Sequence, residues 1–303
     1  MVRPVRFQSN PETAESNKFQ GTPDASRAQA EQAGALKEFE GLVSALRGAG
    51  VDVHVVDDTA EPHTPDSVFP NNWVSFHADG TVVLYPMMAA SRRGERRMDV
   101  LEYLSATGGF RIDRTIDLSV HESEGKFLEG TGSLVLDRVN RIAYACLSPR
   151  THLDLLGEFG QRLDYDIVVF DAHDAGGTPV YHTNVLMCLG ERYAVVCAEA
   201  IVDEGQRKAV LAQLEQSGHE VVAITQEQMA AFAGNMLELE NNEDGKLLVM
   251  SARAEGSLSE SQRARLSSYA KLLSVPITGI EDSAGGSVRC MLAEIHLPRK
   301  TQS

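Results

Sequence analysis

The sequence predicts a mixed α/β fold in which five similar units form one closed propeller. The first observation is size, because 303 residues with 43% hydrophobic content can bury a large core. The second is a recurring order of strand, polar turn, strand, amphipathic helix and strand, with copies about 50 to 60 residues apart. The third is an apolar run at each end of the chain. We therefore expect residues 1–303 to form a single α/β propeller domain.

The clearest copy of this unit lies near residue 80. The runs WVSFH (73–77) and TVVLY (81–85) flank the sequence Ala78-Asp79-Gly80. Asp-Gly between two apolar runs is a strong signal for a β-hairpin. A helix over about residues 92–106 should follow.

Three further copies repeat the same order of elements. Their paired strands and helices are expected at 133–137 and 141–147 with a helix near 151–160, at 185–190 and 193–198 with a helix near 203–217, and at 236–241 and 246–251 with a helix near 259–273.

The sequence predicts a fifth copy that is divided between the two ends of the chain. It opens on the strand PVRF (4–7) and continues into a helix with apolar residues at helical spacing, namely Leu36, Phe39, Leu42, Val43 and Leu46. The run CMLAEIHL (290–297) can pair with the N-terminal strand and leave no open sheet edge. An open α/β sheet with inserted hairpins is the alternative.

Composition narrows the class of function. The formal net charge of −15 disfavours binding to nucleic acid or to an anionic membrane. No apolar run approaches the roughly 18 residues of a membrane span, and the first residues lack a signal-peptide core, so we expect a cytoplasmic protein. The four cysteines form no C-x-x-C pair, which indicates neither a disulfide framework nor a zinc site.

Polar residues of unusual type precede the first strand of each hairpin. If the units share one geometry, these residues should converge on the ring axis. A carboxylate, an imidazole, amides and a thiol in one register are a set suited to covalent catalysis, with a thiolate nucleophile and a histidine that moves protons. They occur at Asn71-Asn72, Glu129-Gly130-Thr131-Gly132, His182-Thr183-Asn184, Gly234-Asn235 and Ser287-Val288-Arg289-Cys290.

Structural roles are the alternative for each of these residues taken singly. His182 could be a structural histidine, and Glu129 could cap a turn. Cys290 differs from the other cysteines, which lie inside apolar runs, because Gly285-Gly286 and Arg289 precede it. Arg289 could help to hold a thiolate. The run 171–174 has no further ligand pair to support a metal site, so we expect no metal and no cofactor.

Six motifs in the same order resemble the guanidino-group modifying superfamily. These are PDSVFPNN (65–72), SRR (91–93), FLEGTG (127–132), SPRT (148–151), YHTN (181–184) and GGSVRC (285–290). The superfamily includes arginine deiminases, dimethylarginine hydrolases and amidinotransferases, which share a five-bladed α/β propeller called the pentein fold. The resemblance spans nearly the whole chain.

The resemblance implies a role for each matching residue. Cys290 would be the nucleophile, His182 the general acid/base and Glu129 the carboxylate that binds the planar head group. Asp66 would bind the α-amino group of a free amino acid. Arg92 and Arg150 would hold its α-carboxylate, for which the guanidinium fork is suited.

The departures from the family pattern point to citrulline as substrate. Asn72, Asn184 and Gly132 stand where arginine-converting relatives have aspartates. A buried guanidinium calls for carboxylate partners, whereas the neutral ureido group offers one carbonyl acceptor and N–H donors that amides match. We therefore predict hydrolysis of citrulline through an S-carbamoyl intermediate. Asn72, Asn184 or the backbone near Gly286 would hold the oxyanion.

Other readings of the sequence remain open at this point. The enzymatic alternatives are an arginine deiminase, an N-methylarginine hydrolase or an amidinotransferase-like enzyme. The non-enzymatic alternative is a propeller-shaped binding module similar to a ribosome-binding translation factor. The expected partner is a small amino-acid substrate, and the outer helices of a closed ring would be available for a homo-oligomer.

Overall fold

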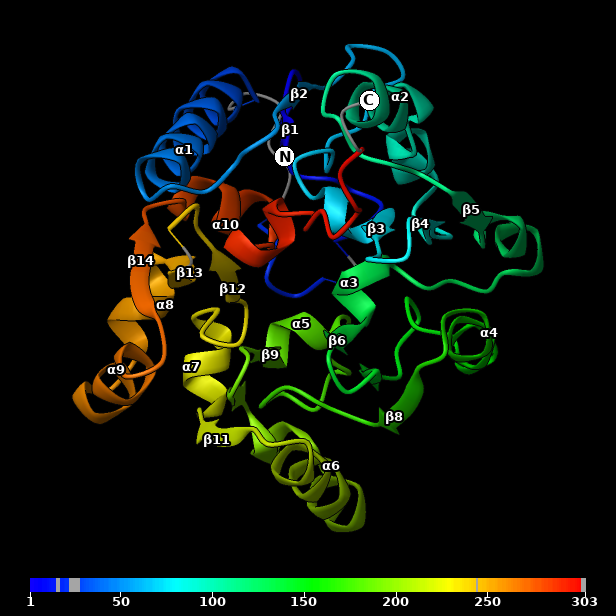
Figure 1. Ribbon diagram of the computed structural model, residues 1–303. Coiled ribbons are helices and arrows are strands. Elements are labelled where there is room, and N and C mark those ends of the chain that lie inside the picture. The colour runs from blue at the N-terminus through cyan, green and yellow to red at the C-terminus, as the bar shows by residue number, and fades with distance from the viewer. Residues whose placement is uncertain (15–16, 22–27, 244, 301–303) are drawn as a thin grey trace.

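Five small β-sheets surround a common centre in the computed structural model of the protein, with helices on the outside (Figure 1). The structure describes residues 1–14, 17–21, 28–243 and 245–300. Within these residues, four of the sheets have three strands and the fifth has two. The fold is therefore mixed α/β, as predicted.

The four three-stranded sheets share one topology. In each, the first two strands pair antiparallel and the third joins the second in parallel. The strands are β3 (Val74–Phe76), β4 (Thr81–Leu84) and β5 (Arg114–Asp117); β6 (Val135–Asp137), β7 (Ile142–Cys146) and β8 (Asp166–Phe170); β9 (Met187–Leu189), β10 (Tyr193–Val196) and β11 (Glu220–Ala223); and β12 (Leu237–Glu240), β13 (Lys246–Ser251) and β14 (Lys271–Val275).

Local sequence explains how each unit turns. Between β3 and β4, Gly80 has a φ of 81°, a conformation that glycine adopts readily. The Asp79 carboxylate accepts the N–H of Thr81 at 3.0 Å, which closes the turn. Amphipathic helices then lead to the third strand of each sheet: α2 (Met98–Ala106), α4 (Leu153–Leu163), α6 (Glu204–Gln216), and the pair α8 (Ala252–Ser257) and α9 (Glu260–Ser267).

Two of the predicted helices are shorter than expected. The helix predicted over 92–106 begins as the 3-10 helix η2 (Ala90–Glu95) and continues as α2 only from Met98. The helix predicted near 259–273 ends at Ser267, and residues 271–275 form β14 instead. β14 pairs with β13 over five residues, so tertiary pairing overrides the helical pattern there.

The fifth unit departs further from the prediction. The long helix α1 (Ala28–Gly48) buries the predicted apolar residues except Leu36, but the N-terminal strand β1 is Val2–Arg3 rather than 4–7. β1 pairs in parallel with β2 (Val56–Asp57). Pro4 lacks the N–H that a longer ladder needs.

The C-terminal run contributes to the core without forming a ladder. Leu292 and Leu297 are buried in two different hydrophobic clusters. In the described part of the chain, the predicted pairing of 290–297 with the N-terminal strand is not recorded, and Arg299 instead bridges to Phe110. The start of the predicted strand is taken up by a 3-10 helix, η5 (Val288–Met291).

Short helical turns carry the chain to the common centre of the five sheets. These are η1 (Pro70–Asn72), α3 (Gly130–Ser133), α5 (Thr183–Leu186) and η5. Neighbouring segments come into close contact at glycines, where a side chain would not fit. A Cβ atom on Gly130 would lie 2.3 Å from the carbonyl oxygen of Asn71, and a Cβ atom on Gly234 would lie 2.2 Å from the carbonyl oxygen of Val185. The units therefore meet backbone to backbone.

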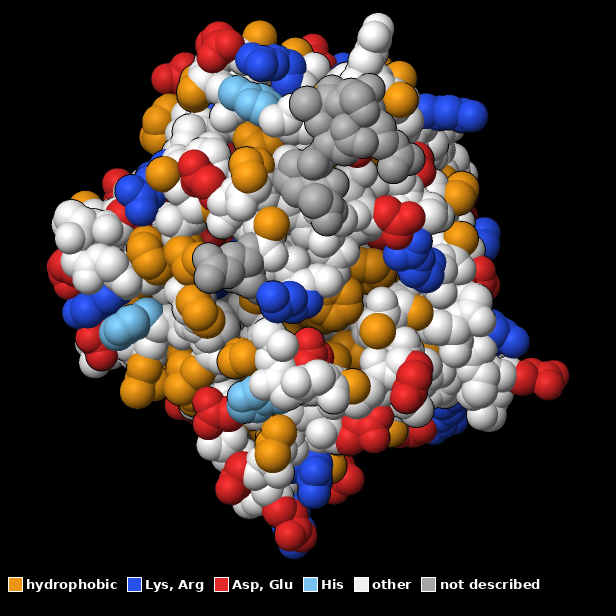
Figure 2. All heavy atoms as spheres, turned by 180° about the vertical axis from the view of Figure 1, so that it is seen from behind, with side chains coloured by type: hydrophobic (Ala, Val, Ile, Leu, Met, Phe, Trp, Pro, Cys, Tyr) orange, Lys and Arg blue, Asp and Glu red, His pale blue; other side chains and the backbone are white. Residues whose placement is uncertain are grey.

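The surface carries mixed charge. On the face turned away from the viewer of Figure 1, Lys and Arg side chains stand among Asp and Glu side chains and gather in no single patch of the described residues (Figure 2). With a net charge of −15, the molecule repels polyanions. None of the helices in the described ranges has the length and apolar character needed to cross a membrane.

We predict that Gly234→Ala destabilises the protein by about 1–3 kcal/mol, because the added methyl meets backbone that cannot move aside cheaply. The matched control is Gly41→Ala within α1, where a Cβ meets nothing within 4 Å. That control should be neutral or stabilising by about 0.5–1 kcal/mol. Urea unfolding measures both, and equal midpoints for the two variants would contradict the close contact at the centre.

Candidate active site

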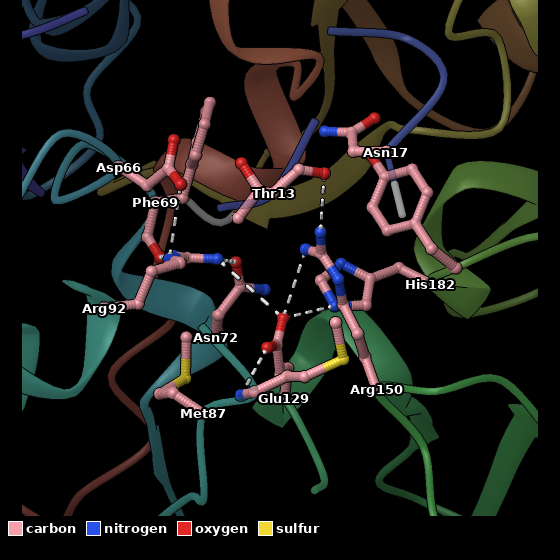
Figure 3. Close-up of polar contacts among 12 residues, drawn as sticks. Thr13, Asn17, Asp66, Phe69, Asn72, Met87, Arg92, Glu129, Arg150 and His182 are labelled. Carbon is pink, nitrogen blue, oxygen red and sulfur yellow. Dashed lines mark hydrogen bonds and ion pairs between the residues drawn. The ribbon is translucent and has the colours of Figure 1, made fainter. Parts of the chain in front are cut away.

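A small cavity lies where the short helical turns meet. Its volume is about 20 Å³, roughly the space of one water molecule. Figure 3 shows Thr13 and Asn17 on one side of the site and Glu129 on the opposite side. The lining residues are Thr13, Asn17, Asp66, Phe69, Asn72, Arg92, Arg150, Tyr181, His182, Ala284, Gly285, Gly286 and Cys290.

Glu129 and His182 form a buried hydrogen bond beside this cavity. Nε2 of His182 lies 2.9 Å from Oε2 of Glu129, and Oε1 of Glu129 accepts the backbone N–H of Met88 at 3.1 Å (Figure 3). An ionised carboxylate only accepts hydrogen bonds, so the imidazole proton sits on Nε2. The lone pair of Nδ1 is then available, and Nδ1 would lie 2.7 Å from a Cβ on Gly132.

Burial sets the charge state of this pair. Desolvation lowers the pKa of His182 to about 4, and the hydrogen bond to Glu129 offsets it only in part. Desolvation also acts to raise the pKa of Glu129, but Arg150, the bond to His182, and Arg92 outweigh it and hold that pKa well below its usual range. At neutral pH the pair is therefore a carboxylate and a neutral imidazole.

Two arginines compensate the Glu129 charge. Nη1 of Arg150 lies 3.5 Å from Oε2 of Glu129, and Nη1 of Arg92 lies 3.8 Å from the same oxygen. The Arg150 guanidinium also lies over the ring of Tyr181, 5.0 Å from its centroid, and donates to the carbonyl oxygen of Thr13 at 3.4 Å. Glu129, which the sequence predicts to bind the head group of the substrate, thus lies between two cations.

Arg92 is held by a second carboxylate and in turn orients Asn72. Its Nε and Nη2 donate to the two oxygens of Glu95 at 2.8 and 2.9 Å, a bidentate geometry. Its Nη1 donates to Oδ1 of Asn72 at 2.9 Å. Because a guanidinium only donates, this contact fixes which end of the Asn72 amide faces Arg92.

The opposite end of the Asn72 amide faces the cavity. Its Nδ2 is buried and has no hydrogen-bond partner within the described residues. A Cβ on Gly132 would lie 2.4 Å from this nitrogen, and so Asn72 Nδ2 and His182 Nδ1 approach the same point. The site thereby combines an N–H donor with a basic lone pair, and the absent side chain of Gly132 leaves room for both.

Cys290 lines the same cavity as His182. It lies on η5, and its thiol is within hydrogen-bond reach of the amides of Asn184 and Asn235. Arg289 does not serve the thiol, since it donates to the carbonyl oxygen of Leu292 and pairs with Glu294. The other three cysteines lie in the hydrophobic core, as predicted.

Of the two remaining predicted substrate-binding residues, Asp66 lines the cavity and Asn184 does not. Oδ2 of Asp66 accepts from Asn10 at 2.8 Å, and its buried Oδ1 has no partner in the described ranges. Asn184 is turned toward Cys290 and is not among the lining residues. Sequence reasoning did not single out Glu95, and it placed Asn235 in the same register as the others without giving it a role.

A match to a known protein family covers almost the whole chain. The family model described as N,N dimethylarginine dimethylhydrolase, eukaryotic, matches residues 3–297. No curated protein is matched by the sequence. The chain is similar in structure to ArgZ, an arginine dihydrolase from the ornithine-ammonia cycle in cyanobacteria, with a TM-score of 0.74 and 19% identity over 97% of this chain and 40% of that one. The chain thus spans less than half the length of full ArgZ.

Two further solved structures have the same fold. The N-terminal domain of ArgZ bound to product is matched over 98% of both chains, with 20% identity and a TM-score of 0.74. A mutant of the dimethylarginine hydrolase DDAH from Pseudomonas aeruginosa, complexed with citrulline, is matched over 96% of both chains, with 16% identity and a TM-score of 0.63. At these identities the likeness concerns the fold.

We predict that His182 stays neutral, with its proton on Nε2, until the pH falls to about 4. Burial disfavours the charged imidazole, so protonation is shifted to more acidic pH than the usual 6.5. Nitrogen NMR of isotopically labelled histidine measures both tautomer and titration, and the His182→Gln variant assigns the signal. A doubly protonated His182 at pH 6 would contradict the assigned charge state.

Proposed function

The chain belongs to the N,N-dimethylarginine dimethylhydrolase family, in the pentein superfamily of hydrolases that act on C–N bonds, and from that membership we propose that it hydrolyses free citrulline. The products would be ornithine, ammonia and carbon dioxide. The observation that carries this proposal is the orientation of the Asn72 amide.

The Asn72 amide supports a substrate that contains a carbonyl group. Arg92 occupies its oxygen, which leaves the Nδ2 donor directed at the cavity. A ureido group presents one carbonyl acceptor to such a donor, whereas a guanidinium presents only N–H groups. Asn72 would also hold the oxygen when it becomes an oxyanion, an effect worth about 10²–10³ in rate for one donor elsewhere.

The charge balance near the reacting thiol supports a neutral head group. Glu129 is compensated by Arg150 and Arg92, and it lies behind His182 rather than on the cavity wall. Among the described residues that line the cavity, Asp66 is the carboxylate, and it lies 3.7 Å from Arg92. A buried guanidinium would therefore lack the uncompensated carboxylates that it needs.

The chemistry assigned to this site has two stages. The Cys290 thiol gives its proton to Nδ1 of His182, and the sulfur attacks the ureido carbon. His182 then returns the proton to the departing δ-nitrogen, which releases ornithine and leaves an S-carbamoyl group. A water loses a proton to His182 and attacks this group, and the C–S bond breaks with its electron pair returning to sulfur. Carbamate separates into ammonia and carbon dioxide.

Citrulline is larger than the cavity of about 20 Å³, so in this proposal the site widens as the substrate enters, and the α-groups are then bound on the side near Asp66. The buried Asp66 Oδ1, without a partner within the described residues, suits an α-ammonium. Arg150 and Arg92 line the cavity and would take the α-carboxylate.

Successive hydrolysis of arginine is the second candidate activity. ArgZ, whose fold this chain shares, is an arginine dihydrolase. In such a sequence an arginine would first lose ammonia to become citrulline, and the second stage would be the reaction proposed here. The same cysteine and histidine would serve both stages. The Asn72 donor supports the citrulline stage and counts only against the arginine stage, because a guanidinium offers it no acceptor.

We predict that the purified protein forms ornithine and ammonia from citrulline and that Cys290→Ser lowers this activity by at least about 10³-fold, because the thiolate is the nucleophile. Citrulline, arginine, agmatine and methylated arginines should be assayed in parallel by product analysis. Ornithine from arginine as well as from citrulline would establish the dihydrolase alternative. Unchanged turnover in Cys290→Ser would remove the nucleophile from the proposal, and no turnover of any substrate would favour a binding module.

We predict that Asn72→Asp lowers kcat for citrulline by about 10²-fold, because it removes the N–H donor and places a negative charge where an oxyanion develops. The control is Asn242→Asp, which makes the same change at an exposed residue. Steady-state kinetics compare the two variants with the unaltered protein. A kcat for Asn72→Asp within roughly threefold of the original would contradict the role of the Asn72 donor.

A further inference from the structure

We propose that Asn235, assisted by Asn184, is a catalytic residue that donates N–H bonds to the Cys290 sulfur whenever this atom carries negative charge. The inference rests on the proposed function only in taking Cys290 as the nucleophile. It holds for any substrate whose carbon that sulfur attacks.

The orientation of the Asn235 amide follows from its contacts. Its Nδ2 lies 2.9 Å from the carbonyl oxygen of Asn184 and 3.3 Å from Sγ of Cys290, while its Oδ1 lies 3.6 Å from the sulfur. A backbone carbonyl only accepts hydrogen bonds, so the nearer atom must be the NH₂ group. One of its two hydrogens bonds this carbonyl, and the other is directed at the sulfur.

Asn184 provides a second and longer contact. Its Nδ2 donates to the carbonyl oxygen of Thr131 at 3.2 Å, which fixes this amide in the same way. The same nitrogen lies 3.7 Å from Sγ of Cys290. The sulfur therefore faces N–H donors from two neighbouring units of the ring, of which the Asn235 donor is the closer.

The cations near the thiol are used elsewhere. Arg92 and Arg150, which line the same cavity, pair with Glu95 and Glu129. Arg289, the neighbour of Cys290 in sequence, donates to the carbonyl oxygen of Leu292 and to Glu294. His182 is neutral at neutral pH because burial lowers its pKa to about 4. A thiolate formed here is consequently stabilised by oriented amide dipoles, which act strongly where water is excluded.

The backbone around Asn235 keeps its side chain in place. Phe232 has a φ of 64°, in the left-handed region, and its carbonyl oxygen accepts the N–H of Asn235 at 2.9 Å. Gly234 packs directly against the backbone of Val185. This tight turn places the Asn235 side chain at the common centre of the five sheets. Asn235 is only 1% exposed, so its N–H donor is already oriented before the reaction starts.

The two donors act at both stages of the reaction. In the first, the S–H proton passes to His182 and the sulfur holds the electron pair that forms the S–C bond. In the second, water forms a C–O bond, the C–S bond breaks and the electron pair returns to sulfur. Stabilising the thiolate therefore assists the departure of the sulfur as well as its formation.

The test measures the reactivity of Cys290 without any substrate. Asn235→Ala, Asn235→Asp and the exposed control Asn242→Ala are treated with iodoacetamide across a range of pH, and labelling of the Cys290 peptide is followed by mass spectrometry. We expect Asn235→Ala to react roughly tenfold more slowly at neutral pH, with its profile moved to higher pH, since a hydrogen bond to a charged group is lost. Asn235→Asp should be slower still, because a carboxylate repels the thiolate. Asn242→Ala should react as the original protein does.

The outcomes separate this inference from the proposed function. If Asn235→Ala and Asn235→Asp retain the original unfolding midpoint and label at the original rate, the inference is overturned, whatever the substrate. If labelling slows as expected while citrulline is not turned over, the inference stands and the proposed function fails. If Asn235→Ala does not fold, the nearly isosteric Asn235→Asp variant decides alone.

Discussion

The buried carboxylate of Glu129 is the constraint on which the site depends. Its partners are Arg92 and the Met88 N–H, which lie between β4 and α2, Arg150, which follows β7, and His182, which precedes β9, so they join three neighbouring units. A buried charge without such partners would cost several kcal/mol, so the units are held in the one register that brings them together. The close backbone contacts at the glycines of the centre allow this approach.

The same ion pairing determines what the cavity can bind. Because Glu129 lies beside Arg150 and Arg92, and Arg92 also pairs with Glu95, these carboxylates already have cationic partners, and in our proposal recognition of the head group falls to amides. Glu95 holds Arg92, and Arg92 orients Asn72. The proposed preference for a carbonyl group therefore depends on Glu95, which does not itself line the cavity.

Sequence reasoning succeeded where periodicity and register carry the information. The repeated unit placed Cys290 and His182 at one centre, and the structure brings both to one cavity. Glu95 was missed although it follows Arg92 at the i,i+3 spacing of many ion pairs, because this spacing does not show that the pair is buried beside the site. The sequence also could not show where a strand in 290–297 would fail. Its alternating apolar residues fit a strand, but the 3-10 helix η5 occupies residues 290 and 291. The sequence placed Asn235 in the correct register, but only the distance of 3.3 Å between its Nδ2 and the Cys290 sulfur shows that the amide adjoins the thiol.

The neutral state of His182 connects these features. An active site that held a thiolate and an imidazolium could rely on their mutual attraction, but burial disfavours the imidazolium here. The thiol must then give up its proton to a weak base, and this step is favourable only if the resulting thiolate is well solvated by the protein. A cavity of about 20 Å³ holds too few water molecules to solvate a thiolate fully. The amides of Asn235 and Asn184 are the groups placed to do so, and their fixed orientation is what makes a neutral histidine sufficient.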